Sequence, residues 1–341
     1  MYKNLITLEN IFFAWYGFKK GKQNKMDVMI FERNLEDNLF ELFHELITKT
    51  YRHQDYQTFH IHDPKFRIIN KADVRDRVVH HLIFKYLEPI FQPGFIKQSY
   101  SCQTGKGIHQ SVQDVRYHLY WASNKFSHKV WSLKMDIKKF FGSVDHEILL
   151  GLIKKKVFDI DVLWLLEKII SSFYSPDKIG KGLPIGNLTS QIFANIYLSE
   201  LDYFAKFNLK EKLYFRYADD FIFLHEGREY LENLEIKMCN FIETSLKLIV
   251  HPDKIIYRKL SQGIDWLGYV ILPYHSVLRA TTRKRMFKKI KIKTELFNCG
   301  LLSSEKLNNS VQSYLGILKH CNGYKIEQKL RNDIWFNKNS V

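Results

Sequence analysis

The chain has 341 residues, 45% hydrophobic and 26% charged, as is typical of a soluble globular protein with one large domain or two to three subdomains. No stretch approaches 18 consecutive apolar residues, so we expect no membrane-spanning segment. The formal net charge of +16 favours polyanionic partners, which bind basic proteins through their phosphates.

The predicted elements alternate between helices and strands along most of the chain. Residues 1–55 are expected to be helical, with apolar positions at helical spacing over residues 34–47. A short strand pair follows over residues 59–70, with its turn at Asp63-Pro64. A helix is expected over residues 74–91 and another over 189–207. A basic helical tail, dense in Lys and Arg from Arg279 to Lys293, ends the pattern.

An acidic pair interrupts an apolar run at Tyr217-Ala218-Asp219-Asp220. The alternation on both sides predicts two strands, so the pair should lie at the tip of a hairpin. Adjacent carboxylates are unfavourable unless water or a cation neutralises them. An ordinary surface turn is the alternative interpretation, because Asp is favoured in turns.

A second acidic segment places Asp136 at the end of a short apolar strand, before a helix-like stretch. Carboxylates on neighbouring strands are hard oxygen ligands, suited to Mg²⁺ that takes the rest of its shell from water and substrate phosphates. Two such ions can activate a 3′-hydroxyl and stabilise a departing pyrophosphate. Asp145 is a competing acidic candidate, but its context predicts a helix cap.

These motifs occur in an order that resembles reverse transcriptases. The resemblance rests on Asp136 with Phe140-Phe141, on residues 182–191 (GLPIGNLTSQ), on Tyr-Ala-Asp-Asp at 217–220, and on Trp266-Leu-Gly-Tyr269. Residues 75–81, 99–109 and 183–197 most closely resemble enzymes of bacterial and phage diversity-generating retroelements. The resemblance covers nearly the whole chain.

The resemblance implies an α+β fold with the right-hand polymerase architecture: fingers, an antiparallel palm sheet and a helical thumb. Its expected domains are a helical N-terminal extension at 1–58, fingers and palm at 59–275, and a thumb at 276–341. The expected catalytic and metal-binding residues are Asp136, Asp219 and Asp220, with a main-chain oxygen near Ile137. Two Mg²⁺ ions are the implied cofactors, with Mn²⁺ as a possible substitute.

Several residues are expected around the incoming nucleotide. Phe141 matches the family's bulky ring against the incoming sugar, which selects deoxynucleotides; a core aromatic is the alternative. Ile185 stands where most relatives carry Gln, a replacement that accompanies errors opposite template adenine in the diversity-generating group. A neutral apolar substitution remains open there. The other expected nucleotide contacts are Lys65, Arg67, Gly186 and Gln191.

Further contacts are expected along the pyrophosphate and the nucleic acid. Lys254 matches a lysine that donates a proton to the leaving pyrophosphate. The hairpin Trp266, Leu267, Gly268 and Tyr269 resembles the primer grip, although a sheet edge would bury the same residues. Template or duplex contacts are expected at Lys106, Arg283, Lys284 and Arg285.

The predicted function is an RNA-directed DNA polymerase that copies a retroelement template RNA into error-prone, adenine-mutagenised cDNA. Expected partners are the template RNA, the cDNA duplex, deoxynucleoside triphosphates and a small basic accessory protein, with no membrane. A retron-type or phage-defence reverse transcriptase and a non-catalytic RNA-binding scaffold are the alternatives. Four cysteines without CxxC spacing predict reduced thiols, no structural zinc and a cytoplasmic location.

Overall fold

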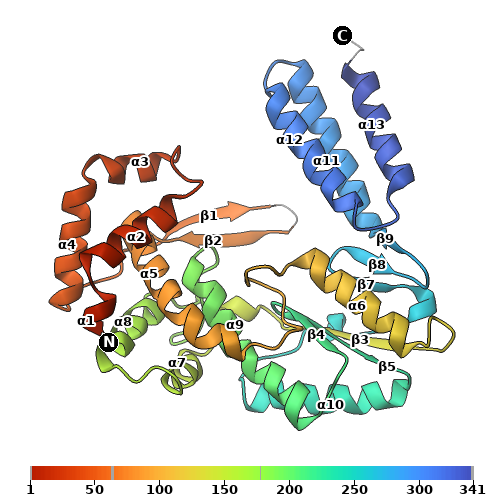
Figure 1. Ribbon diagram of the computed structural model, residues 1–341, viewed down its shortest axis with the longest axis horizontal. Helices are drawn as coiled ribbons and strands as arrows, with labels where there is room; N and C mark the ends of the chain where they lie inside the picture. The colour runs from red at the N-terminus through yellow and green to blue at the C-terminus, as the bar shows by residue number, and fades with distance from the viewer. Residues whose placement is uncertain (1, 63–64, 177, 339–341) are drawn as a thin grey trace. The chain divides into compact units, whose positions relative to one another are not determined.

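The computed structural model describes residues 2–62, 65–176 and 178–338, with side chains described as far as residue 333, and it is a mixed α+β structure (Figure 1). The chain divides into two compact units, each assembled from three stretches. The first holds residues 1–105, 135–221 and 236–254, and the second holds 106–134, 222–235 and 255–341. Among the described helices, none combines the length and the apolar character that crossing a bilayer requires.

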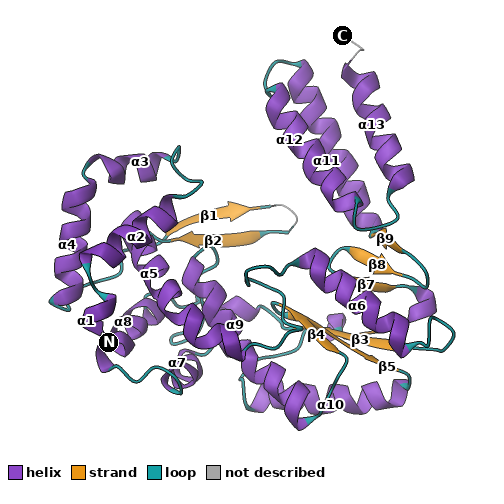
Figure 2. Cartoon of the chain, in the orientation of Figure 1, coloured by secondary structure: helices purple, strands orange, loops and turns teal. Residues whose placement is uncertain are grey.

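Helices dominate the first unit (Figure 2). They are α1 (Tyr2–Leu5), α2 (Leu8–Lys19), α3 (Met26–Arg33), α4 (Leu35–Ile47), α5 (Val74–Phe91), α7 (His146–Lys154), α8 (Ile160–Ser171) and α9 (Leu188–Tyr203). Helix α5 lies at the centre, since α2 and α9 both pack on it. It begins after Asp73, whose carboxylate caps the helix by accepting from the backbone N–H of Arg75 at 3.1 Å.

The expected strand pair and helices are confirmed. Strand β1 (Gln57–Ile61) pairs antiparallel with β2 (Arg67–Lys71), and the turn predicted at Asp63-Pro64 lies outside the described residues. Helix α5 has the predicted bounds. Phe193, Tyr197 and Leu201 form a buried stripe along α9, which continues as a π-helical turn over Phe204–Asn208.

A four-stranded sheet carries the acidic residues, in the order β4 (Tyr214–Tyr217), β5 (Asp220–His225), β3 (Trp131–Asp136) and β6 (Ile256–Lys259). Strand β3 pairs antiparallel with β6, and β4 joins β5 through the predicted hairpin. Helix α10 (Arg228–Thr244) follows β5. Strands β4 and β5 are buried on both faces: Tyr214, Phe215, Phe221, Ile222 and Phe223 are all fully buried.

The second unit contains α6 (Ile108–Ala122) and a three-stranded antiparallel sheet of β7 (Ile264–Trp266), β8 (Tyr269–Ile271) and β9 (Ser276–Leu278). Its last part is a bundle of α11 (Ala280–Asn298), α12 (Ser304–Leu318) and α13 (Tyr324–Lys338), in which each helix contacts the other two (Figure 1). Apolar side chains at helical spacing, such as Met286 and Ile290 on α11 and Leu307 and Val311 on α12, fill this bundle.

Candidate active site

The acidic hairpin turn lies against the end of β3. Strand β4 ends at Tyr217 and β5 begins at Asp220, so Ala218, with φ +52°, and Asp219 form the turn. The backbone N–H of Ile137 donates to the carbonyl of Asp219 at 3.2 Å, and the N–H of His251 donates to the carbonyl of Asp136 at 2.8 Å. The fold therefore brings Asp136 beside the Asp219 turn, although the two are far apart in sequence.

The carboxylates in this region interact electrostatically. The pKa of Asp219 is raised to about 6 by burial and, to a smaller extent, by the neighbouring Asp136 and Asp220 carboxylates, while Lys254 opposes the rise. Asp136 is nearly buried, and its Oδ1 lies 2.5 Å from the ammonium of Lys254. The site thus holds more negative charge than its buried surroundings favour, and one lysine partly compensates for it.

The donor set of this site fits a divalent cation of the Mg²⁺ type. In the part of the chain that the structure describes, no three His, Cys, Asp or Glu side chains form a ready-made metal cluster, and Asp136 instead contacts Lys254. Carboxylate and main-chain oxygens are nevertheless the ligands that Mg²⁺ takes, usually with few protein ligands and the remainder from water and phosphate. The mutual repulsion that raises the pKa of Asp219 is what a bound cation would relieve.

Asp145 caps α7, as its sequence context predicts. Its carboxylate accepts from the backbone N–H groups of Glu147 at 3.1 Å and Ile148 at 3.2 Å. Burial alone would raise the pKa of Asp145, but these hydrogen bonds and the nearby Lys247 and Lys181 hold it below its usual value. The Asp145 carboxylate therefore serves as the N-terminal cap of α7.

Phe141 lies beside the segment that contains Gly182 and Leu183. It belongs to a short 3₁₀ turn, Phe140–Gly142, in which Phe140 is buried and Phe141 is half-exposed. The two rings meet edge to face, with centroids 5.3 Å apart. The N–H of Leu183 donates to the carbonyl of Phe141 at 2.6 Å, so the turn and the glycine-containing segment hold each other in place.

The loop containing Ile185 and Gly186 packs on β2. The N–H of Asn70 donates to the Ile185 carbonyl at 3.0 Å, and the Asn187 side chain bonds the Asn70 carbonyl at 2.7 Å. Gly186 has φ +116°, and a Cβ there would lie 2.8 Å from Cγ2 of Ile69, so only glycine fits without rearrangement. These bonds connect the loop to the strand that begins at Arg67.

The side chains of the nucleotide candidates differ in exposure. Lys65, Arg67 and Gln191 are exposed, while Ile185 is half-buried. Lys65 just before β2, Arg67 on β2 and Gln191 in the first turn of α9 are therefore accessible to a solute. Their contacts with a nucleotide stay predictions.

The Trp266-Tyr269 segment forms the predicted hairpin in the second unit. Leu267 and Gly268 make its turn with φ +49° and +93°. Trp266 is buried and its indole N–H donates to the Ser111 hydroxyl at 2.9 Å, while the buried Tyr269 hydroxyl donates to the Ile317 carbonyl at 3.1 Å. Both rings are core residues of this unit, so only the turn between them is accessible.

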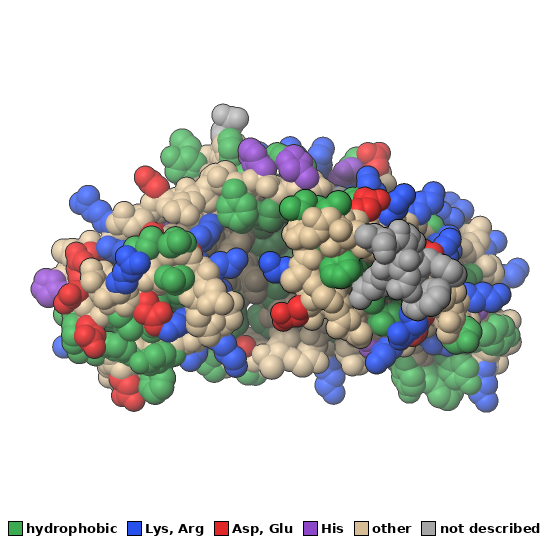
Figure 3. Space-filling view, turned by 90° about the horizontal axis from the view of Figure 1, so that it is seen from above, with side chains coloured by type: hydrophobic (Ala, Val, Ile, Leu, Met, Phe, Trp, Pro, Cys, Tyr) green, Lys and Arg blue, Asp and Glu red, His purple; other side chains and the backbone are tan. Residues whose placement is uncertain are grey.

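The basic candidates of the second unit are more exposed. Arg283, Lys284 and Arg285 lie in the first turns of α11 with exposed side chains, and Lys106 is half-exposed before α6. Lys and Arg side chains lie across the face displayed in Figure 3, interspersed with exposed hydrophobic ones.

The sequence reasoning missed Arg216, which is fully buried two residues before the acidic turn. Its guanidinium donates to both oxygens of Asp202 at 2.7 and 2.6 Å and to the Ala218 carbonyl at 3.1 Å. Ser99 accepts a further bond at 2.9 Å. The available signal was a single cation inside the aromatic run Tyr214-Phe215-Arg216-Tyr217.

The comparisons identify the family. The sequence model of the family described as "Reverse transcriptase (RNA-dependent DNA polymerase)" matches residues 60–271, more than half of the chain, and the chain belongs to that family. Protein YkfC of Escherichia coli is 23% identical over 244 residues, covering 61% of this chain and 64% of that protein. Group II intron-encoded protein LtrA of Lactococcus lactis subsp. cremoris is 23% identical over 374 residues, covering 88% and 58%.

A solved structure is similar in fold. Apo telomerase from Candida tropicalis has a TM-score of 0.52 at 13% identity, covering 85% of this chain and 63% of that one. This likeness concerns the fold alone. The chain spans 64% and 58% of the lengths of the two curated relatives named above.

Proposed function

We propose that the chain is an RNA-directed DNA polymerase whose reaction is centred on Asp136, Asp219 and Asp220. The observation that carries the proposal is the 3.2 Å bond from Ile137 to the Asp219 carbonyl, which sets the acidic turn beside the end of β3. The mutual charge effect that raises the pKa of Asp219 supports it. Membership of the reverse transcriptase family supplies the reaction class.

In this proposal, the three carboxylates and a main-chain oxygen at Ile137 would hold the two divalent ions. Bound Mg²⁺ supplies charge neutralisation and activation of the primer hydroxyl. Lys254 already contacts Asp136, so its ammonium belongs to the same small region and would donate a proton to the departing pyrophosphate. Arg67 offers a planar fork that suits phosphate oxygens, with Lys65 as a second cation.

Phe141, Gly186 and Gln191 would shape the space for the incoming nucleotide. The half-exposed ring of Phe141 would exclude a 2′-hydroxyl and so select deoxynucleotides. Gly186 allows its loop to lie against β2, where a Cβ would meet Ile69, and the Asn70 bond holds the loop there. The expected fingers and palm at 59–275 and thumb at 276–341 belong to this proposal, with the primer at the Leu267-Gly268 turn and the duplex along Lys106 and residues 283–285.

The finer proposal is mutagenic copying of a retroelement RNA for diversification of a target gene, with a small basic accessory protein. Its support is Ile185, a half-buried apolar side chain where most related enzymes carry Gln. An apolar contact distinguishes correct from incorrect pairs less than a hydrogen bond does. A reverse transcriptase of the group II intron kind is the second candidate, because LtrA aligns with 88% of the chain.

Primer extension, followed by sequencing of the cDNA, tests both the polymerase mechanism and the mutagenic copying. The purified chain with an RNA template, a DNA primer, deoxynucleoside triphosphates and Mg²⁺ is expected to make cDNA. The Asp219→Asn/Asp220→Asn variant should abolish the product. A matched control is Glu36→Gln/Asp37→Asn, which neutralises an adjacent, exposed acidic pair in α4 and should leave the product unchanged. Full extension by the Asp219/Asp220 variant would refute the polymerase mechanism.

Sequencing of the cDNA then tests the proposal of mutagenic copying. Errors concentrated opposite template adenine support the diversity-generating assignment. Errors spread evenly over the four template bases would contradict it and favour the intron-like, retron or defence alternatives.

A further inference from the structure

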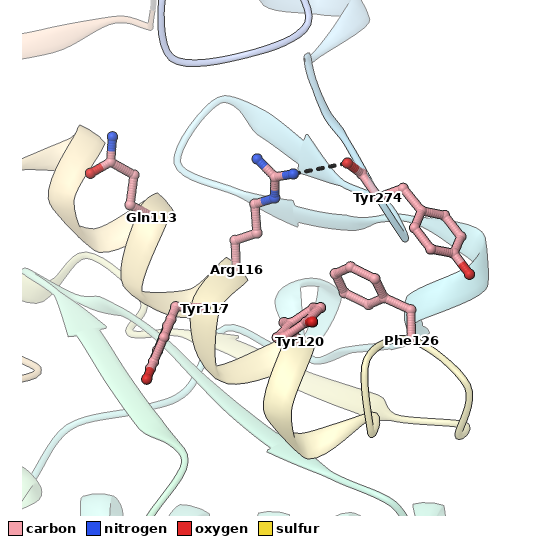
Figure 4. Close-up of a pocket in the computed structure, with 6 residues that line it drawn as sticks. All are labelled: Gln113, Arg116, Tyr117, Tyr120, Phe126 and Tyr274. Carbon is pink, nitrogen blue, oxygen red and sulfur yellow. Dashed lines mark hydrogen bonds between the residues drawn. The ribbon is translucent and has the colours of Figure 1, made fainter.

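An aromatic hollow lies on the second unit, away from the acidic turn in the sequence and built only from α6, the loop after it and the β8–β9 connection. Its volume is about 500 Å³, and the residues that line it are Gln113, Arg116, Tyr117, Tyr120, Phe126 and Tyr274 (Figure 4). Tyr117 is 60% exposed and Tyr274 is 73% exposed. Together with the half-exposed Tyr120 and Phe126 they form a contiguous aromatic patch, which is the kind of exposed apolar surface that marks a binding site.

The rings of this hollow contact one another edge to face. Phe126 lies between Tyr120 and Tyr274, with centroids 5.3 Å from each and interplanar angles of 77° and 73° (Figure 4). Trp121, 57% exposed, meets Tyr120 at 82°. Tyr117, Trp121 and Tyr274 are each more than half exposed, so their rings are accessible for stacking on a flat solute.

Two of these rings, those of Phe126 and Tyr274, belong to residues with left-handed backbone. Asn124, Lys125 and Phe126 have φ values of +45°, +57° and +70°, and Tyr274 has +69°. Left-handed backbone at non-glycine residues is unfavourable, and it clusters at functional sites. The hydroxyl of Ser123 accepts from the N–H of Phe126 at 3.0 Å, and this bond helps to fix the loop.

A second, polar hollow of about 430 Å³ continues the first one, since Gln113, Arg116 and Tyr274 line both. It adds His275, Lys319, His320 and Asn322 among its lining residues. Of the described residues that line the two hollows, none is acidic. Arg116 donates to the Tyr274 carbonyl at 2.8 Å (Figure 4), and both residues line the aromatic and the polar hollow.

We propose that these two hollows form one groove that binds single-stranded RNA, a proposal that rests on the proposed use of RNA as template. Accessible rings beside cations are the combination that binds single strands, because each base stacks on a ring and each phosphate approaches a cation. The amide of Gln113 and the imidazole of His275 can exchange hydrogen bonds with a ribose 2′-hydroxyl, the group that distinguishes RNA from DNA. A duplex would keep its bases stacked internally and could not use the rings.

The test is fluorescence anisotropy with a labelled 12-nucleotide oligouridine RNA, its DNA equivalent and a blunt RNA hairpin, using the full chain. Tyr117→Ala and Tyr274→Ala should each weaken binding of the single-stranded RNA by about 5- to 150-fold, the range for one base stack. Both side chains are largely exposed, so the variants should fold. Tyr324→Ala, which removes a ring 69% exposed on α13 of the same unit, is the matched control and should bind as wild type does.

The proposed contact between Lys319 and an RNA phosphate is tested by the salt dependence of RNA binding. Lys319→Gln should lower the slope of log Kd against log salt by about 0.7, the value for one phosphate contact on a single strand. Cross-links from a 4-thiouridine RNA should map to the groove. Unchanged affinity in both tyrosine variants, equal binding of the DNA, or cross-links confined to other parts of the chain would each overturn the proposal.

Separate measurements of RNA binding and of polymerisation distinguish a failure of the groove from a failure of the proposed function. Binding is measured in the Asp219→Asn/Asp220→Asn background, where no polymerisation is expected. Short-template primer extension is measured separately in the tyrosine variants. If wild type has no polymerase activity but its RNA binding depends on Tyr117 and Tyr274, the proposed function is refuted and the groove is not. If wild type has polymerase activity but its RNA binding does not depend on these tyrosines, the groove is refuted and the proposed function is not.

Discussion

The ion pair between Arg216 and Asp202 should determine both the stability of the sheet and the geometry of the acidic turn. The pair is fully buried, and Asp202 also accepts from the Tyr214 hydroxyl at 2.8 Å. Burial would lower the pKa of Arg216, but Asp202 more than offsets this and raises it, so the guanidinium stays charged. Neutralising Asp202 therefore leaves an uncompensated cation in the core.

The expected size of this effect is large. Breaking a buried pair by removing one partner typically destabilises a protein by about 3–5 kcal/mol. Asp202→Asn, which keeps the shape of the side chain, should lower the free energy of unfolding by about that amount in urea titrations monitored by circular dichroism. A change below about 1 kcal/mol would refute the inferred dependence on this charge, because exposed pairs contribute that little.

A second variant separates stability from positioning. Replacing Tyr214, Asp202 and Arg216 together with apolar side chains, as Tyr214→Phe/Asp202→Leu/Arg216→Met, should recover much of the lost stability, although the Ser99 hydroxyl loses its bond from Arg216. It would still lack the 3.1 Å bond from Arg216 to the Ala218 carbonyl. We expect kcat in primer extension to fall by about 100-fold, the effect of a small misplacement of reacting groups, with an unchanged KM for the primer–template. Wild-type kcat in this folded variant would contradict a positioning role for Arg216.

Three further predictions concern single residues of the candidate site. The pKa of Asp219 is raised to about 6 from 3.8, so the folded state binds more protons than the unfolded state between these values. Metal-free protein should therefore lose stability relative to Asp219→Asn as pH rises from about 4 to about 6, and a flat difference curve from urea titrations would contradict this. Phe141→Ala should raise ribonucleotide incorporation at least about 10-fold in single-nucleotide extension, if the ring excludes the 2′-hydroxyl; no change would assign Phe141 to packing. Ile185→Gln should reduce errors opposite template adenine about 10-fold in sequenced cDNA, and an unchanged error spectrum would make Ile185 a neutral substitution.

Local patterns predicted the elements that carry the site. Helical spacing predicted α5 at residues 74–91, and the interrupted alternation around Asp219 predicted the β4–β5 hairpin. Such features depend on neighbouring residues, so sequence periodicity reports them. The capping role of Asp145 was likewise predictable, because a cap uses the next three residues.

Contacts between distant segments were not predictable in this way. Alternation along β4 shows only that Arg216 lies on the opposite face from Phe215 and Tyr217; because both faces of β4 are covered, Arg216 is buried and needs Asp202 from α9. The Lys254–Asp136 contact likewise depends on how the segment after α10 returns to β3. Periodicity carries no information on which charged residues the fold brings together.

Binding of Mn²⁺, followed by electron paramagnetic resonance, tests the central claim that the three acidic residues hold divalent cations. The titration compares wild type, Asp136→Asn, Asp219→Asn/Asp220→Asn and the control Glu36→Gln/Asp37→Asn, each with primer–template and a deoxynucleoside triphosphate. We predict tight binding in wild type and the control, and its loss in both site variants. Equal Mn²⁺ binding in all four proteins would contradict the account.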